Sequence, residues 1–565
     1  GALSLPALKD GVSRARLMNT DALPMKDTVP DGWRGVMRRV MTSPVLLALV
    51  VVLSFFWQLG AMPLYDLDEG AFTEATREML ASGNYITPHR DGEPRYDKPV
   101  LIYWLQAAST QVVGFDEFGL RLPSALAASL WVLALWFFVR ERLDALTATV
   151  AGLALALSLQ VSLIGKAAVA DALLNLFIAL TFFEIYRYWQ ALDLKSGRRF
   201  VRRAYLWMGL GFLTKGPVAV FFPVVVSLLF VLSSLRWSRA SLLAFWYWLR
   251  AVFNPLGWLI FLLVAGPWYL AIYLDDGAGF FKSFFLDHNL GRFDEAMHGH
   301  RGFPGYYLFM LLVILLPFTG WMLSLFKRYR SAWLDPLDRF LWIWFLVVLV
   351  FFSFSGTQLP HYLLYGATPL FILMARHREA LTNRWLAFVP PLVFFGLLLV
   401  LPFVLDVAMV VAGRPYDVIL FEEARHAITL EYGIAALGGL LLTVLMLRWS
   451  SPPLWQRLVL VGLVQTLVVY GEVVPRVLDT LQAPVKEAAL IAKRTELPTV
   501  VYRTSMPSFS VYREAITPNR APKPGELAFL RVDKLEHLTH EHPELDLELI
   551  YHRGHVALLR ARPGD

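Results

Sequence analysis

The chain contains no cysteine among its 565 residues, and only 17% of its residues are charged. The lack of cysteine excludes disulfide bonds and thiolate metal sites, and it removes the usual sequence indication of the redox compartment. The sequence also lacks an internal repeat and any low-complexity tract. It is instead rich in hydrophobic residues, at 57%, and its 19 Trp and 21 Tyr suit the two membrane interfaces. Because a soluble protein would not bury this much apolar material, we expect a membrane protein.

The apolar stretches predict about thirteen membrane-spanning helices of roughly 20 residues each. The first, 43–60, follows a basic segment, so the positive-inside rule puts the N-terminus in the cytoplasm. The stretch 99–114 is apolar but short, and we expect it to lie at the interface without crossing. Counting it as a span would move the downstream basic loops to the outer side, which the same rule disfavours. The remaining expected spans are 119–139, 144–163, 171–190, 203–215, 217–235, 252–274, 305–325, 340–356, 359–375, 385–405, 429–447 and 457–474.

This pattern divides the chain into three regions. Residues 1–42 form an N-terminal cytoplasmic segment that begins with a polar leader outside the fold, and residues 43–474 form the transmembrane catalytic domain. Residues 475–565 are less apolar and predict a small α/β domain on the outer side. Its expected elements are a helix at Ala483–Arg494 and alternating, strand-like stretches at Thr499–Tyr502, Ser508–Tyr512, Glu526–Val532 and Leu547–Leu559. The expected outer loops of the membrane domain are 61–98, 275–304 and 406–428.

Three carboxylates, Asp66, Asp68 and Glu69, follow the first span directly, at the edge of the bilayer. Charge at this depth is costly and usually functional. The alternative is that Asp68 caps the helix that follows, where apolar residues recur at helical spacing. A cap is worth only about 1 kcal/mol and accounts for one acid of the three, so a functional role is favoured.

The same loop ends in the sequence Arg95-Tyr96-Asp97-Lys98-Pro99. Lys98 either reaches out to phospholipid headgroups or binds the phosphate of a lipid carrier and neutralises it as it leaves. Arg77 and Arg95 are candidate second donors to such a phosphate. Beyond the loop, Tyr103 and Trp104 in the interfacial stretch could form part of a lateral gate for lipid substrates.

Asp171 begins the expected span 171–190 at the outer membrane boundary, where Asp68 also lies. The two acids could share one cavity, although an N-cap is an equally open interpretation of Asp171. Lys215 occupies a Gly-Pro turn at the outer surface, which is an unspecific signal alone. The segment Ser355–Tyr362 interrupts two spans, and broken backbone at membrane depth is tolerated where it lines a cavity.

The loop Asp287–Phe293, followed by His298 and His300, is rich in polar donors. Histidine and aspartate can bind a metal, and Asp97 with His288 are the candidate ligands. No ligand set with a recognised spacing is present, so a structural or substrate-binding role is favoured over a metal site.

In this order and between these spans, the motifs resemble the GT-C membrane glycosyltransferases, in the branch of protein O-mannosyltransferases and bacterial lipid A aminoarabinose transferases. The resemblance covers nearly the whole chain from about residue 40 onward. Within the superfamily, about thirteen expected spans followed by a small C-terminal outer domain resemble the aminoarabinose transferases most closely. One departure is Gln358, where many relatives carry lysine before Leu-Pro. The motifs that carry the resemblance are Asp66–Glu69, Tyr96–Pro99, Leu213–Pro217, Asp287–Asn289 with Arg292-Phe293, and Leu359–Tyr362.

The resemblance implies transfer of 4-amino-4-deoxy-L-arabinose from undecaprenyl phosphate to lipid A phosphates, at the periplasmic face of the bacterial inner membrane. Such a transfer gives resistance to polymyxin. The expected catalytic residues are Asp68, Asp171 and Lys98. The expected substrate-binding residues are Asp66, Glu69, Arg77, Tyr96, Tyr103, Lys215, His288, Arg292, His361 and Tyr362. The sequence requires no cofactor beyond the candidate divalent metal and no nucleic acid, and we expect a monomer.

The role of Asp68 depends on the acceptor. A phosphate is already ionised near neutral pH, so Asp68 would orient it or bind the donor's amino group, whereas a hydroxyl acceptor would require a general base. Two alternatives remain open at this point: transfer of mannose or another sugar to a protein hydroxyl, and transport of lipid-linked sugars. A transporter should show repeat symmetry and a site near the bilayer midplane, and the outward cluster of acids argues against it.

Overall fold

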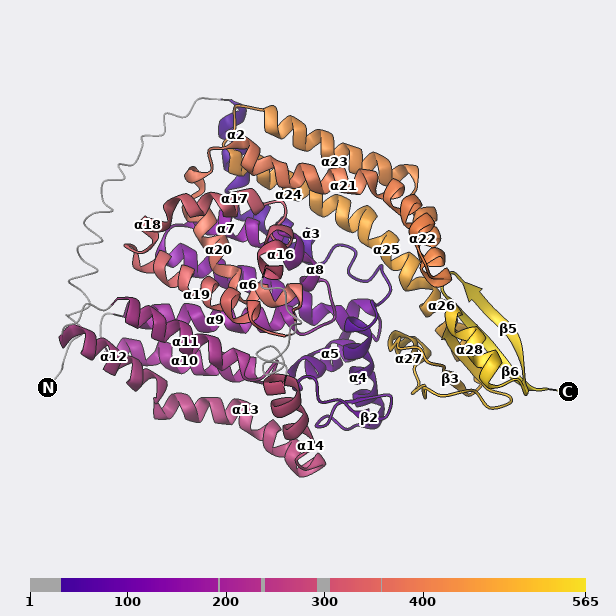
Figure 1. Cartoon of the computed structure of the whole chain (residues 1–565). Coiled ribbons are helices and arrows are strands. Elements are labelled where there is room, and N and C mark those ends of the chain that lie inside the picture. Colours follow the sequence, from indigo (N-terminus) through magenta and orange to yellow (C-terminus); the bar gives the residue numbers. More distant parts are fainter. Residues whose placement is uncertain (1–31, 192–193, 235–238, 292–304, 357, 565) are drawn as a thin grey trace.

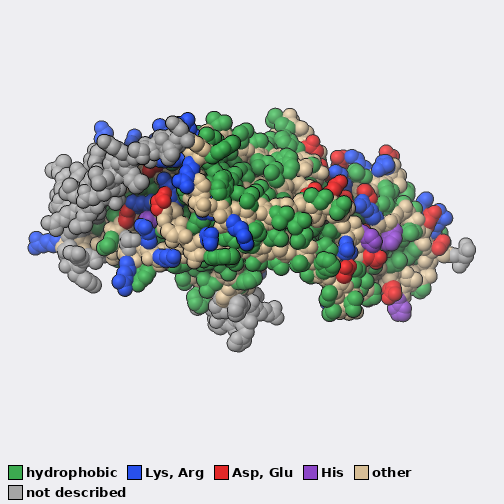
Figure 2. Space-filling model, turned by 90° about the horizontal axis from the view of Figure 1, so that it is seen from above, with side chains coloured by type: hydrophobic (Ala, Val, Ile, Leu, Met, Phe, Trp, Pro, Cys, Tyr) green, Lys and Arg blue, Asp and Glu red, His purple; other side chains and the backbone are tan. Residues whose placement is uncertain are grey.

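The computed structural model describes residues 32–191, 194–234, 239–291, 305–356 and 358–564. Within these ranges, six helices are long and apolar enough to cross a membrane, or nine if each of three bent pairs is one span. The chain is therefore a mostly helical, multi-pass membrane protein. Figure 2 shows a broad apolar band across the middle of the molecule, with charged side chains gathered toward both ends.

Most of the expected spans coincide with helices, and polar residues start several of them. Asp116 and Asp144 cap α6 (Glu117–Arg142) and α7 (Ala145–Leu157), because their carboxylates accept from the amides of Gly119 and Thr147. The small residues of α7 let it lie buried at the centre of the bundle. The other helices at expected spans are α3 (Pro44–Phe55), α9 (Asp171–Trp189), α10 (Leu194–Phe212), α11 (Val218–Ser233), α13 (Pro255–Asp276), α19 (Pro336–Ser353), α21 (Arg384–Val411), α23 (Leu430–Arg448) and α24 (Leu454–Val468).

Three expected spans are broken in the structure. The expected span 144–163 bends by 72° between α7 and α8 (Leu159–Gly165). The expected span 305–325 bends by 119° between α16 (Tyr306–Ile314) and the helix that starts with α17 (Thr319–Ser324). Pro317 lies at the second bend, where it lacks the amide that a continuous helix needs. The expected span 359–375 is a 3-10 turn, η3 (Pro360–Gly366), followed by the short helix α20 (Thr368–Arg376). The expected count of about thirteen spans of roughly 20 residues thus stays a prediction.

Two short helices lie at the end of the bundle, outside the long ones: α4 (Asp68–Ser82) and α5 (Leu101–Val113) (Figure 1). At 13 residues, α5 is about 20 Å long, too short to cross about 30 Å of hydrocarbon. It packs against α4 and α6, which agrees with the interfacial position expected for 99–114.

The C-terminal residues form a four-stranded sheet with helices packed on it, at the end of the molecule beside α4 (Figure 1). The strand order is β3-β4-β6-β5, with β3 and β4 parallel and the other pairs antiparallel. The strands are β3 (Thr499–Val501), β4 (Leu527–Arg531), β5 (Leu545–Arg553) and β6 (Val556–Pro563), and the helices are α26 (Ala483–Thr495), α27 (Ser508–Arg513) and α28 (Leu535–Glu541). The preceding helix α25 (Val474–Leu481) ends the long apolar helix Leu454–Leu481 that begins with α24.

The expected strand at Ser508–Tyr512 is wrong, because these residues form the helix α27. Phe509 stacks on Phe529 of the sheet, with 4.2 Å between ring centroids, while α27 also packs on α4. Alternation of apolar and polar residues indicates a strand when one face is buried and the other is exposed. Here the segment has no exposed face, because its first four residues are all buried: Ser508, Phe509, Ser510 and Val511. The expected helix at Ala483–Arg494 is present as α26.

Candidate functional site

A cavity of about 600 Å³ lies at the end of the bundle that carries α4. Its walls come from distant parts of the chain: the loop after α3, the segment 90–98, Arg121 of α6, the turn before α9, the turn at Lys215, η3 and α25. Eight of the expected catalytic, substrate-binding and metal-ligating residues line this one cavity, namely Asp68, Glu69, Asp97, Lys98, Asp171, Lys215, His361 and Tyr362. The structure therefore brings together the acids and cations that the sequence only places in separate loops.

Asp68 and Asp171 occupy equivalent positions, since each is the first residue of its helix. The N-cap positions belong to Leu67 and Ala170, and neither helix has a side-chain capping bond. The capping interpretation of the two acids is therefore wrong. Both carboxylates instead line the cavity at a helix N-terminus, where the helix dipole favours negative charge.

Asp68 lies in an electrostatic field made by the other cavity residues. Burial raises the pKa of its carboxyl, and the negative charges of Asp171 and Glu69 raise it further. His361 and Lys98 act in the opposite direction and lower it. The pKa of a carboxyl group held among these opposing charges shifts when another cation or anion enters the cavity.

Arg95 also lines the cavity, and its guanidinium lies 4.9 Å from the centroid of the Phe72 ring. Its Nε and Nη1 atoms are buried and have no hydrogen-bond partner among the described residues. Only a 3.7 Å contact to Asp97 is recorded for its Nη2 atom. Buried N–H groups normally have partners, so these two donors are available to a ligand with oxygen acceptors, such as a phosphate.

Lys215 is held at the opposite wall by two tyrosines. Its ammonium lies 4.1 Å from the ring centroid of Tyr362 and hydrogen-bonds the hydroxyl of Tyr365. This places a cation beside Tyr362, in the segment that follows Gln358.

Several expected substrate-binding residues have other partners. Asp66 is buried against Ser508, and Glu69 pairs with Arg121, with Nε 2.8 Å from Oε2. Arg121 was not expected, although a charged residue inside the apolar stretch 119–139 was a readable signal. Its guanidinium also donates to the carbonyls of Leu59, Met62 and Pro63.

Three further expected residues, Arg77, Tyr96 and Tyr103, do not line the cavity. Arg77 is buried against Glu74, with its Nε 2.9 Å from Oε2. The Tyr96 hydroxyl bonds Asp276, and Tyr103 is fully buried beside Phe72. Arg292 lies outside the described residues, as do the 292–304 part of the expected outer loop 275–304 and residues 1–31.

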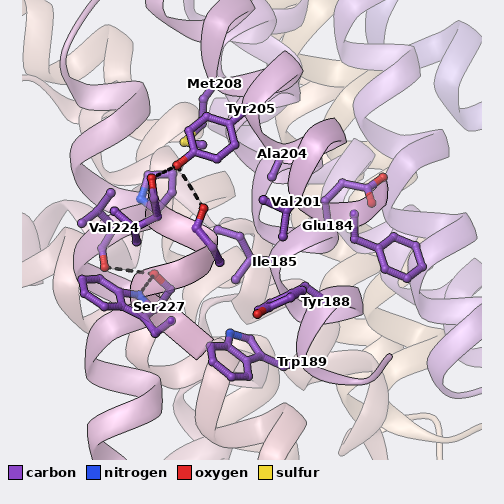
Figure 3. A pocket seen from close by; sticks show the side chains of 15 residues that line it. Glu184, Ile185, Tyr188, Trp189, Val201, Ala204, Tyr205, Met208, Val224 and Ser227 are labelled. Atoms are coloured by element: carbon purple, nitrogen blue, oxygen red, sulfur yellow. Dashed lines mark hydrogen bonds between the residues drawn. The ribbon is translucent and has the colours of Figure 1, made fainter. Parts of the chain in front are cut away.

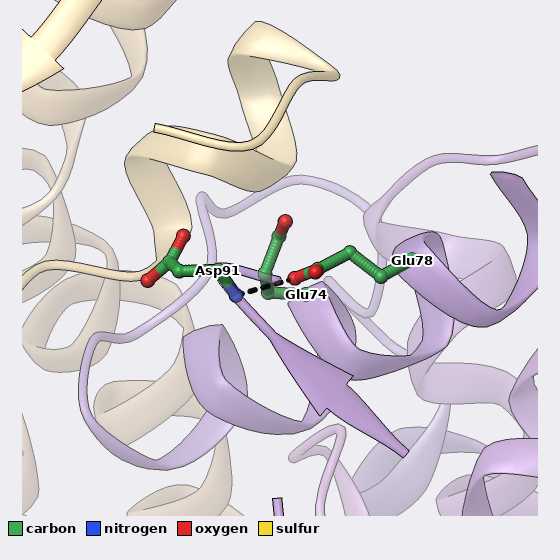
Figure 4. A group of neighbouring side chains, drawn as sticks. All are labelled: Glu74, Glu78 and Asp91. Atoms are coloured by element: carbon green, nitrogen blue, oxygen red, sulfur yellow. Dashed lines mark hydrogen bonds between the residues drawn. The ribbon is translucent and has the colours of Figure 1, made fainter. Parts of the chain in front are cut away.

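The candidate metal ligands Asp97 and His288 are in contact, with Oδ1 3.2 Å from Nε2. They supply two ligand atoms, whereas protein zinc sites use three or four, so the described residues do not complete a metal site there. Three other acids, Glu74, Glu78 and Asp91, lie close together (Figure 4). Glu78 accepts from the amides of Asp91 and Gly92 at 2.7 Å each, and Glu74 is paired with Arg77, so these acids have protein partners.

A second, smaller cavity of about 60 Å³ lies between α9, α10, α11 and α12 (Arg239–Val252) (Figure 3). Two of its polar groups have local partners: the Tyr205 hydroxyl donates to the carbonyl of Ala251 at 3.2 Å, and Trp248 donates to Ser227 at 2.9 Å. This space is consistent with imperfect helix packing and shows no catalytic group pair.

Comparison with known proteins identifies the family. Residues 97–269 match the family model described as dolichyl-phosphate-mannose-protein mannosyltransferase. The chain is 30% identical over 443 residues to the undecaprenyl phosphate-alpha-4-amino-4-deoxy-L-arabinose arabinosyl transferase of Aeromonas hydrophila, covering 74% of this chain and 76% of that protein. The enzyme of the same name from Aeromonas salmonicida is 29% identical over 433 residues, covering 74% and 75%.

The fold has a close solved counterpart. The crystal structure of ArnT from Cupriavidus metallidurans bound to undecaprenyl phosphate superposes with a TM-score of 0.74 at 19% identity, over 91% of this chain and 97% of that one. The resemblance expected from the motifs is confirmed. The chain is a membrane glycosyltransferase of the GT-C fold, and it belongs to the family of undecaprenyl phosphate-alpha-4-amino-4-deoxy-L-arabinose arabinosyl transferases.

Proposed function

We propose that this protein transfers 4-amino-4-deoxy-L-arabinose from undecaprenyl phosphate to the phosphate groups of lipid A, and so confers resistance to polymyxin and other cationic peptides. The observation that carries the proposal is the single cavity in which Asp68 and Asp171 face Lys98 and the unpartnered donors of Arg95. An aminosugar phosphate presents one cation and one anion, and this cavity offers a group of opposite charge to each.

The cavity faces the periplasm, in a chain of about thirteen spans of roughly 20 residues each in the inner membrane. Helix α9 supports this orientation, because it starts at Asp171 in the cavity and carries Arg187 near its other end. At 19 residues, α9 is about 28 Å long, close to the thickness of the hydrocarbon core. Arg187 lies in a group with Arg140, Arg199 and Arg203, as expected of the cytoplasmic side. The C-terminal α/β domain then lies in the periplasm with the cavity.

The reaction breaks the bond between the anomeric carbon and the phosphate oxygen of the donor. The electron pair leaves with that oxygen, and an oxygen of the lipid A phosphate forms the new bond to the anomeric carbon. The main task of the protein is to stabilise the growing charge on the leaving undecaprenyl phosphate. Lys98 and Arg95 perform it, and Arg95 replaces the expected Arg77 because Arg77 is tied to Glu74.

Asp68 and Asp171 bind the ammonium group of the aminosugar. Two carboxylates in one partly buried cavity repel each other, and a cation between them relieves that repulsion. The acceptor phosphate is already ionised, so it needs no general base. The acids therefore hold the sugar, while Lys98 and Arg95 stabilise the phosphate as it leaves.

Mass spectrometry of lipid A tests the proposal. A Gram-negative strain that lacks its own transferase is complemented with this protein or with its Asp68→Ala variant. A pentose-amine mass increment with the intact protein, and none with an equally expressed variant, is the expected result. No increment from a well-expressed intact protein contradicts the proposal.

A second candidate acceptor is a protein hydroxyl, which the description of the family model matched by residues 97–269 favours. In that reaction Asp68 acts as the general base, because a hydroxyl must lose its proton. The intact mass of periplasmic proteins from the same strains separates the two, since only this alternative adds a sugar to protein.

A further inference from the structure

The residue before Asp68 has an unusual backbone conformation. Leu67 has φ 69° and ψ −54°, a turn geometry that is rare and strained for residues other than glycine. Its side chain is 63% exposed, so burial of Leu67 itself does not hold the turn in place. Strained backbone persists only where the surrounding contacts enforce it.

One set of contacts lies on the N-terminal side of Leu67. The buried carboxylate of Asp66 accepts from the backbone amide of Ser508 at 2.8 Å and from its hydroxyl at 2.5 Å. Gly70 allows this close approach, because a Cβ atom there would lie 2.7 Å from Asp66 Oδ1 and 2.8 Å from the Ser508 nitrogen. Asp66 is thus anchored to α27, which belongs to the C-terminal unit of sheet and helices formed by residues 483–563.

A second set of contacts lies on the C-terminal side. Glu69 Oε1 accepts from the amide of Tyr65 at 3.0 Å, and Oε2 accepts from the amide of Ala168 at 2.7 Å. Arg121 binds both carboxylate oxygens, at 3.0 and 2.8 Å. Because Ala168 belongs to the turn that leads into Asp171, Glu69 joins the loops that carry the two cavity acids.

We propose that Asp66 and Glu69 are positioning residues, which hold the strained turn at Leu67 and thereby direct Asp68 into the cavity, with Ser508 and Arg121 as their anchors. The inference rests on the proposed function of Asp68 and deepens it. Of the three neighbouring acids, Asp66 is buried and does not line the cavity, whereas Glu69 lines it but is buried, with its carboxylate held by Arg121. Asp68 alone of the three is exposed. The C-terminal unit thereby acquires a role in the reaction, since it supplies the serine that fixes Asp66.

Substitution of Asp66 separates positioning from substrate binding. Asp66→Asn keeps an oxygen that accepts from Ser508, so it should retain most of the kcat for sugar transfer. Asp66→Ala should lower kcat by about tenfold or more with little change in KM, because displacement of a reacting group by about 1 Å can cost up to about 100-fold. If Asp66 bound the sugar ammonium, Asn and Ala would raise KM alike, and that result overturns the proposal.

A double substitution tests the strained turn. Ser508→Ala weakens the anchor and should lower kcat, whereas glycine adopts a positive φ without strain. Leu67→Gly added to Ser508→Ala should therefore recover at least about threefold of the lost kcat. The matched control is Ser510→Ala, in the same helix but bonded to Asp91, which should leave kcat unchanged. A double variant no faster than Ser508→Ala overturns the proposal.

Hydrogen–deuterium exchange of the full chain in detergent measures how firmly the turn is held, and it requires neither sugar donor nor acceptor. Asp66→Ala and Ser508→Ala should accelerate exchange in residues 65–70, and Ser510→Ala should not. Unchanged exchange in both variants overturns the proposal. If both variants exchange faster but the wild-type protein transfers no aminosugar, the proposed function is contradicted and the positioning role stands.

Discussion

His361, in the turn η3, lies with its Nε2 atom 3.7 Å from Oδ1 of Asp171, the first residue of α9. This contact joins η3 to the turn that carries the second cavity acid. His361 also lowers the pKa of Asp68, whereas Asp171 raises it. The two side chains therefore act on Asp68 in opposite directions.

We expect this opposition to appear in the pH dependence of transfer. Asp68 must be ionised to bind an ammonium, so activity falls as the pH drops through its raised pKa. Asp171→Asn should move this acidic limb of kcat/KM to lower pH, and His361→Gln should move it to higher pH. Steady-state kinetics of the purified variants between pH 4 and about 8 measure the shifts. Identical limbs in both variants contradict the assignment.

Loss of either phosphate-binding cation should slow the chemical step. Lys98→Ala should reduce kcat by about 10²–10³-fold, the usual effect of removing a donor that stabilises developing charge. Arg95→Lys should lie between wild type and Arg95→Ala, because lysine keeps the charge but loses the planar fork. Single-turnover rates with undecaprenyl-phosphate-linked aminosugar provide the measurement. Normal turnover by Lys98→Ala, with intact expression, contradicts its role.

Arg77 provides a contrasting case, in which we expect an effect on stability. Arg77→Ala leaves Glu74, whose side chain is fully buried, without its counter-ion, which should cost about 3–5 kcal/mol. A double variant that replaces both residues by apolar ones of similar size should recover most of that loss. Thermal unfolding in detergent checks both. The transfer rate per folded molecule should stay near wild type, and a specific loss of kcat would restore Arg77 to the site.

The sequence indicated the loops that meet in the cavity but not the orientation of their side chains. Charged residues at bilayer depth correctly identified the loops that meet in the cavity, because few structural roles require them there. Which of Asp66, Asp68 and Glu69 faces inward depends on the φ angle of Leu67 and on partners far away in the sequence, Ser508 and Arg121. No local pattern reports such contacts.

The pairing of Arg77 with Glu74 was predictable from the sequence, since Glu74 lies three residues before it and such pairs meet on one face of a helix. The error at α27 has a different origin. A short segment buried on both sides shows neither helical nor strand periodicity, so tertiary packing decides its structure.

The buried carboxyl of Asp66 should make the stability of the protein depend on pH. Burial raises the pKa of Asp66 to about 7, although hydrogen bonds from Ser508 lower it. The unfolded chain loses this proton near the ordinary value of 3.8, whereas the folded protein keeps it until about pH 7. The folded state thus binds more protons over this interval, and stability falls as the pH rises through it. The upper limit of the effect is about 4 kcal/mol, at about 1.4 kcal/mol per pKa unit.

Asp66→Asn stays neutral at every pH and should remove this dependence. Its Tm in detergent, relative to wild type, should therefore increase from pH 5 to about pH 8, while Ser510→Ala should follow the wild-type curve. Parallel curves for wild type and Asp66→Asn would mean that Asp66 is ionised in the folded protein throughout. In that case Ser508 compensates the buried charge, and its replacement by alanine should destabilise the protein equally at pH 5 and pH 8, because an ionised carboxylate loses the same charge-assisted bond at both pH values.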